Sequence, residues 1–132
     1  PIWISLGGWV SNLHQAAYGT VDQYLPIFAG AALGEMFVSS TYRRMTGVLA
    51  RQHPRRLRDV LDFEDTFRES QASRCFPLLA RYDRIIDFDR QQAAYAGMDL
   101  AVLEKGHITG SLATTTIRGW LERHVARTPA RR

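Results

Sequence analysis

The residues most able to do chemistry in this sequence are the carboxylates of its middle part. Asp83 and Asp87 are four residues apart and Asp62 and Asp65 are three apart, so each pair would share one face of a helix. Four carboxylates that converge in a helical bundle would bind a hard divalent cation. Arginines are interleaved with these acids along the chain. We therefore expect surface ion pairs at these positions rather than a metal site.

Histidine and cysteine give no metal-binding or redox pattern. A di-iron bundle needs Glu-x-x-His on two helices, and only Glu104 and His107 have that spacing. Cys75 is the single cysteine, so the chain has no Cys-x-x-Cys pair and no intramolecular disulfide. We expect no metal, no cofactor and a reducing, cytoplasmic setting.

One histidine lies in a setting that could bind a ligand. The four histidines are widely spaced and no two share a motif: His14, His53, His107 and His124. His14 lies beside an apolar helical face and precedes Tyr24 and Phe28, and these three residues could line a small-ligand pocket together with Trp9. This arrangement resembles the F and G helices of haem-binding sensor globins, with His14 in the place of the proximal ligand. A small-ligand or haem sensor is therefore one alternative function.

A cluster of arginines suggests a second alternative. Six arginines occur within sixteen residues, between Arg43 and Arg58. Clustered arginines attract phosphate groups, and we take Arg43, Arg44, Arg55 and Arg56 as candidate phosphate-binding residues of a nucleic-acid-binding module. The acidic residues that follow from Asp59 onward would instead neutralise a solvated helical face.

Periodicity predicts a mainly α protein, a compact bundle of five or six helices with a short extended N-terminal arm. The 132 residues suit one domain, which we place at residues 1–127 with a basic tail at 128–132. Hydrophobic residues make up 45% and charged residues 23%, as in ordinary globular proteins. The expected helices span approximately 9–18, 21–38, 42–52, 54–73 and 78–103, with a last helix that ends near residue 127.

The first 42 residues contain no lysine and no arginine, which points to a buried or interacting segment. The expected helix at 21–38 is apolar nearly all round, and its uncharged run between Asp22 and Glu35 is too short to span a membrane. Gly30 and Gly34 form a Gly-x-x-x-Gly pattern that lets another helix, or a bulky side chain, approach closely. Candidate interaction residues are Trp3, Trp9, Phe28, Gly30 and Gly34.

These features favour a non-enzymatic helical regulatory or protein-interaction domain. We expect it to associate through its apolar N-terminal helices, either with a second copy of itself or with another protein. No catalytic motif stands out from the sequence, and the two binding functions described above stay as alternatives.

Overall fold

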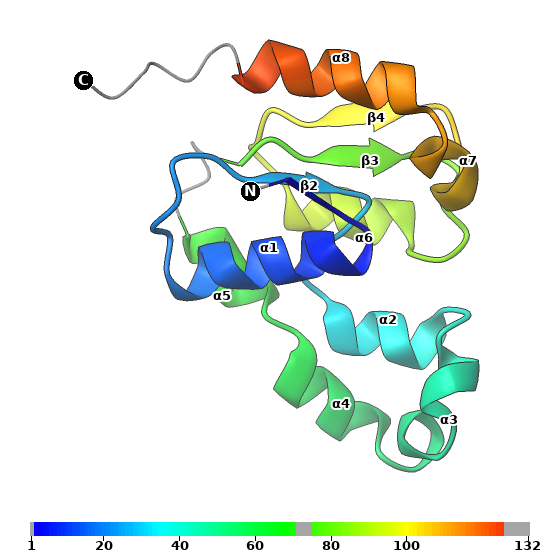
Figure 1. Ribbon diagram of the computed structural model, residues 1–132. Coiled ribbons are helices and arrows are strands. Elements are labelled where there is room, and N and C mark those ends of the chain that lie inside the picture. The colour runs from blue at the N-terminus through cyan, green and yellow to red at the C-terminus, as the bar shows by residue number, and fades with distance from the viewer. Residues whose placement is uncertain (1, 71–74, 126–132) are drawn as a thin grey trace.

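The protein contains a four-stranded parallel sheet with helices on both faces (Figure 1). The computed structural model describes residues 2–70 and 75–125. The strands are β1 Ile2–Ile4, β2 Leu25–Ile27, β3 Leu78–Ala80 and β4 Ala101–Leu103, and their order in the sheet is their order in the chain. The expected helical bundle is therefore wrong, because the fold is mixed α/β.

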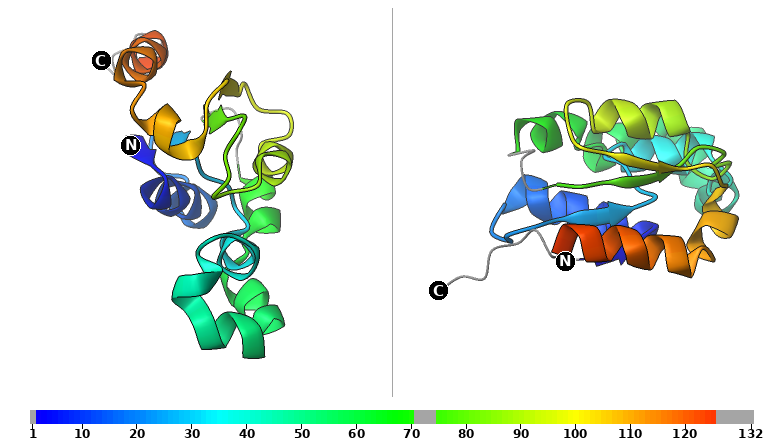
Figure 2. Two further views of the ribbon diagram at one scale, coloured as in Figure 1. Left: turned by 90° about the vertical axis from the view of Figure 1, so that its right-hand side faces the viewer. Right: turned by 90° about the horizontal axis from the view of Figure 1, so that it is seen from above.

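Helices cover the two faces of the sheet unequally (Figures 1 and 2). One face carries α1 Leu6–Ala17, α5 Glu64–Glu69 and α6 Phe88–Ala94, and the other carries α8 Thr114–Val125. The short helix α7 His107–Ser111 lies at the end of the sheet to which the strands point. Three further helices project from the sheet as a lobe, and in the chain they follow β2 and precede β3: α2 Leu33–Ser39, α3 Arg43–Gln52 and α4 Pro54–Leu61.

The strands explain why periodicity misled the prediction. All residues of β2 and β3 are buried, and a strand buried on both faces shows no alternation of apolar and polar residues. No helix spans 21–38, where β2 is followed by a loop and then by α2. No helix spans 78–103 either, since this stretch folds as β3, α6 and β4. The predicted extended arm is β1, an edge strand of the sheet.

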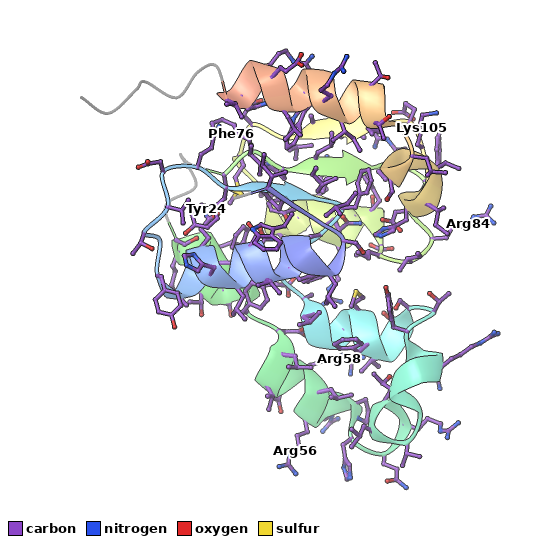
Figure 3. The ribbon with its side chains drawn as sticks, viewed as in Figure 1. Tyr24, Arg56, Arg58, Phe76, Arg84 and Lys105 are labelled. Atoms are coloured by element: carbon purple, nitrogen blue, oxygen red, sulfur yellow. The ribbon has the colours of Figure 1, made fainter. Side chains whose placement is uncertain are left out.

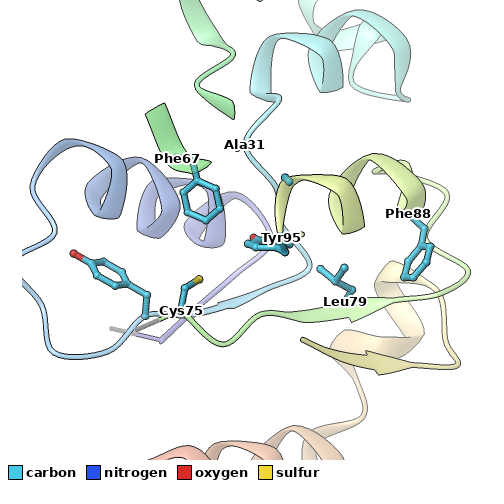
Figure 4. Close-up of a cluster of buried hydrophobic side chains, with 8 residues drawn as sticks. Ala31, Phe67, Cys75, Leu79, Phe88 and Tyr95 are labelled. Atoms are coloured by element: carbon cyan, nitrogen blue, oxygen red, sulfur yellow. The ribbon is translucent and has the colours of Figure 1, made fainter. Parts of the chain in front are cut away.

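Apolar side chains from the helices fill the space against both faces of the sheet. On the face of α1, α5 and α6, the rings of Phe67 and Tyr95 pack edge to face beside Leu79 and Cys75 (Figure 4). On the other face, Trp120 of α8 packs in a cluster with residues of β2 and β3. The two clusters therefore bury the central strands between layers of helices.

The lobe is attached through a close contact between α2 and α4. A Cβ at Gly34 would lie 2.7 Å from the Cα of Arg58, so only glycine allows the two backbones to approach this closely. Glu35 forms an ion pair with Arg58. Burial raises the pKa of Glu35, but hydrogen bonds from Arg58 and Ser39 outweigh this and hold it below its usual value.

The remaining helices differ from their predicted boundaries. The first helix begins at Leu6 rather than near residue 9, and the helix expected at 54–73 ends at Leu61 before α5 begins. At this break the Asp62 carboxylate accepts the backbone N–H of Glu35 (3.1 Å), so the side chain turns the chain instead of extending a helix. The predicted end of the last helix and the basic tail lie outside the described residues.

Within residues 2–70 and 75–125, no helix is both long enough and apolar enough to cross a bilayer.

Candidate active site

Three polar side chains meet just beyond the C-terminal ends of three strands. Ser5 follows β1, Asp83 follows β3 and His107 follows β4. His107 Nε2 lies 2.9 Å from Ser5 Oγ, and His107 Nδ1 lies 2.7 Å from Asp83 Oδ2. Because the strands are parallel, their C-terminal ends lie at the same end of the sheet. Binding sites of parallel sheets occur at this end.

Ser5 occupies a strained turn between β1 and α1. Its φ of 54° and ψ of −123° are rare for a residue other than glycine. The Ser5 N–H donates to the Ile27 carbonyl (2.8 Å), which fixes the turn against β2. Gly8 lets α1 lie close to the sheet, since a Cβ there would come within 2.6 Å of the Ala29 Cβ. The result is a serine hydroxyl held in one direction by the backbone on both sides.

Asp83 is buried and fully hydrogen bonded. Its side chain is 0% exposed, and its Oδ1 accepts the backbone N–H groups of Ile85 (2.8 Å) and Ile86 (2.9 Å). Its other oxygen, Oδ2, faces His107. Backbone donors and an imidazole N–H stabilise a buried carboxylate. Asp83 therefore fixes the orientation of the imidazole, and a proton on Nδ1 would complete this hydrogen bond.

His107 begins α7, and its ring is packed as well as hydrogen bonded. Its side chain is 8% exposed, and its ring centroid lies 5.7 Å from that of Phe28. Phe28 itself has a positive φ of 51° and is fully buried. A Cβ at Gly110 would lie 2.7 Å from Phe28 Cζ, so the glycine makes room for this ring. Phe28 and Asp83 together leave the imidazole one orientation, with Nε2 toward Ser5.

The three side chains are connected in the order Ser5, His107 and Asp83, which is the order that transfer of a serine proton to histidine requires. With its proton on Nδ1, His107 presents the Nε2 lone pair to the Ser5 hydroxyl and can accept its proton. Leu6 is the first residue of α1, and the first N–H groups of a helix have no intrahelical acceptor. The Leu6 N–H is therefore available beside Ser5, at the positive end of a twelve-residue helix.

A surface pocket of about 250 Å³ adjoins His107. Tyr82, Arg84, Ile85 and Ile108 are among the residues that line it. Figure 3 shows Arg84 extending from this end of the molecule into solvent. An organic group of modest size would fit beside the imidazole.

The structure disperses the interaction residues that the sequence suggested. Trp9, Phe28, Gly30 and Gly34 are buried, whereas Trp3 on the edge strand is 48% exposed. Gly30 lies in the loop after β2, where a Cβ would be 3.2 Å from Trp9 Cη2. Gly34 lies in α2 against α4, so the two glycines serve different contacts and form no common face.

The structure brings His14 and Tyr24 together, as a ligand pocket would require. His14 Nδ1 lies 2.9 Å from the Tyr24 hydroxyl oxygen, which links α1 to the residue before β2. Tyr24 is only 1% exposed and belongs to the core between α1 and the sheet. This contact is a structural cross-link with no direct connection to Ser5.

The predicted phosphate-binding arginines all lie on the lobe, away from the sheet. Arg43 and Arg44 begin α3, and Arg55 and Arg56 lie in the first turn of α4. All four side chains are exposed, and Figure 3 shows Arg56 pointing outward from α4.

The carboxylates considered as a metal site have separate roles. Asp62 accepts a backbone N–H of α2, Asp65 pairs with Arg68, and Asp87 caps α6 by accepting the N–H of Arg90. Asp83 belongs to the set with His107 and Ser5. In the part of the chain that the structure describes, no group of three histidine, cysteine or acidic residues could hold a metal ion.

Sequence reasoning missed Ser5 and the roles of Asp83 and His107. A signal for Ser5 existed, because the run Ser5-Leu6-Gly7 directly after an apolar segment matches the second half of Gly-x-Ser-x-Gly. Trp3 stands where that motif has its first glycine, which hid the pattern. Asp83 and His107 carry no local motif, and only the strand order reveals them.

Comparisons with protein-family models, curated proteins and solved structures found no match for this chain.

Proposed function

We propose that this protein is a serine hydrolase that cleaves carboxylic esters or related acyl compounds. The observation that carries the proposal is the hydrogen-bonded series Ser5, His107 and Asp83. A serine on a strained strand-to-helix turn, followed in the chain by an aspartate and then a histidine, is the arrangement of α/β-hydrolases. Ser5 has that turn, and the three residues occur in that order.

The proposed reaction begins with attack of Ser5 Oγ on the carbonyl carbon of the substrate. As the new C–O bond forms, His107 Nε2 takes the hydroxyl proton, and the carbonyl π electrons move onto oxygen. Asp83 stabilises the imidazolium. The Leu6 N–H donates to the oxyanion.

Collapse of this tetrahedral intermediate breaks the bond to the leaving group, which takes the proton from His107. Water then attacks the acyl-serine, with His107 again accepting and returning a proton. The products are a carboxylic acid and an alcohol.

We prefer this proposal to the non-enzymatic domain that the sequence favoured, for a physical reason. A surface that only binds a partner protein does not require a serine with a positive φ. It also does not require a buried aspartate that orients a histidine. Strain and buried charge cost stability, and they gather at sites where they have a use.

A fluorophosphonate probe tests the proposal directly, because it phosphonylates only activated serines. We expect the full chain to gain one adduct, which peptide mass spectrometry places on Ser5. Ser5→Ala should abolish the adduct, and His107→Ala should slow labelling about 10³-fold or more.

Ser39→Ala is the matched control, since Ser39 is exposed and its hydroxyl donates to Glu35 within α2. This variant should label at the wild-type rate. Equal labelling of wild type and Ser5→Ala would overturn the proposal.

A further inference from the structure

The lobe presents exposed apolar side chains beside a concentration of positive charge. Val48 and Leu49 on α3 are 55% and 57% exposed, and Val60 on α4 is 70% exposed. Leu49 and Val60 line a shallow groove of about 280 Å³ between the two helices. We use the name α3–α4 surface for the exposed side chains of these two helices, which include five arginines: Arg43, Arg44, Arg51, Arg55 and Arg56.

The charge on this surface is not neutralised from within the lobe. Among the described residues, none of the five arginines forms an ion pair, and Arg58, the sixth, is taken up by Glu35. The one acid on α3 or α4 is Asp59. The surface therefore carries a net positive charge that calls for an anionic partner.

The apolar side chains decide what kind of anionic partner fits. A nucleic acid would neutralise the arginines but leave Val48, Leu49 and Val60 in water. A second copy of the same surface would bury the apolar residues but would set five arginines against five others. An anionic lipid bilayer satisfies both, because apolar side chains enter the acyl region while arginines remain among the headgroups.

We infer that the α3–α4 surface docks on a lipid bilayer that carries anionic headgroups. The helices would lie in the interface rather than span the membrane. The amphipathic pattern of α4 supports this mode, since Leu57, Val60 and Leu61 share one side of this short helix and the arginines occupy the rest. Docking here is independent of the chemistry at Ser5.

Sedimentation with vesicles tests the inference on the full chain. Vesicles of equal parts phosphatidylglycerol and phosphatidylcholine should bind the protein, and pure phosphatidylcholine should bind at least about tenfold less. Added salt should weaken binding. Val48→Asp/Val60→Asp and Arg55→Gln/Arg56→Gln should each reduce binding by about tenfold or more.

Control variants make single changes of the same two kinds on α8. Val125→Asp and Arg118→Gln alter exposed residues of α8, and they should bind vesicles as the wild type does. Ser5→Ala should also bind normally, so docking and hydrolysis can fail separately. Circular dichroism shows that each variant is folded.

Three results would overturn the inference. One is equal binding to both vesicle types or to neither. Another is salt-sensitive binding to duplex DNA that Arg55→Gln/Arg56→Gln loses and Val48→Asp/Val60→Asp keeps. That result would mean that the surface binds nucleic acid. The third is a dimer in light scattering that Val48→Asp/Val60→Asp converts to a monomer.

Discussion

The His107 imidazole lies 2.9 Å from the Ser5 hydroxyl although 102 residues separate them in the chain. β1 and β4 are opposite edge strands of one parallel sheet, so the contact spans the sheet. It forms because both strands point to the same end, where α7, which begins with His107, lies. Asp83 joins them from the loop after β3.

The carboxylate of Asp83 should be essential for the activation of Ser5. In Asp83→Asn an amide replaces the acceptor of the His107 Nδ1 proton, which favours the wrong tautomer. We expect the fluorophosphonate labelling rate to fall about 10³- to 10⁴-fold. Asp87→Asn is the control four residues away, because asparagine also caps a helix, and it should label normally. Normal labelling of Asp83→Asn would contradict the assigned role.

Phe28 packs against His107 and should affect catalysis only by holding the imidazole in position. Gly110→Ala places a methyl group 2.7 Å from Phe28 Cζ, so the buried ring must shift. We expect the labelling rate of Ser5 to fall about 10- to 100-fold, as for a displacement of about 1 Å. Stopped-flow labelling and thermal unfolding measure rate and stability separately.

Gly119→Ala is the comparison for this glycine. Gly119 lies inside α8, and the nearest atom to an added Cβ is the flexible Arg123 Nη1 at 3.8 Å. Alanine there should leave labelling unchanged and stabilise the fold by about 0.5–1 kcal/mol. If both alanine variants label at the wild-type rate, Phe28 does not hold the imidazole in place.

Stability should decline at alkaline pH because of two buried groups. Burial raises the pKa of Cys75 from 9.0 to about 12, and burial also raises the pKa of Tyr95 well above its usual value. Above pH 9 the unfolded chain releases the Cys75 proton while the folded chain keeps it. The free energy of unfolding should therefore be insensitive to this thiol below pH 9 and fall by about 1.4 kcal/mol per pH unit above it.

Urea denaturation at several pH values measures this slope. Cys75→Ala removes one of the two groups, so its slope between pH 9 and 10 should be shallower than that of the wild type. Identical slopes would mean that the thiol is not protected by burial. The folded wild-type protein should also resist alkylation at Cys75 until denaturant is added.

Local patterns predicted only the local parts of this fold. The helices at 42–52 and in the first half of 54–73 were close to α3 and α4 in their bounds, although the backbone of α3 is kinked at Gly47. Only β1 was anticipated, as an extended arm, and the other strands were missed because they are three residues long and β2 and β3 are wholly buried. Buried apolar runs in a parallel sheet resemble a buried helix in sequence.

The sequence by itself determined the chemistry that each residue can offer and the charge of the lobe. A serine followed by a glycine two residues later, an isolated aspartate and an isolated histidine were all present, but none of them marked a site. Tertiary structure decided which of them act together. Hydrogen bonds between parallel strands bring the C-terminal ends of β1, β3 and β4 to the same end of the sheet. The strained backbone of Ser5 exists only because β2 and α1 hold the turn in which it lies.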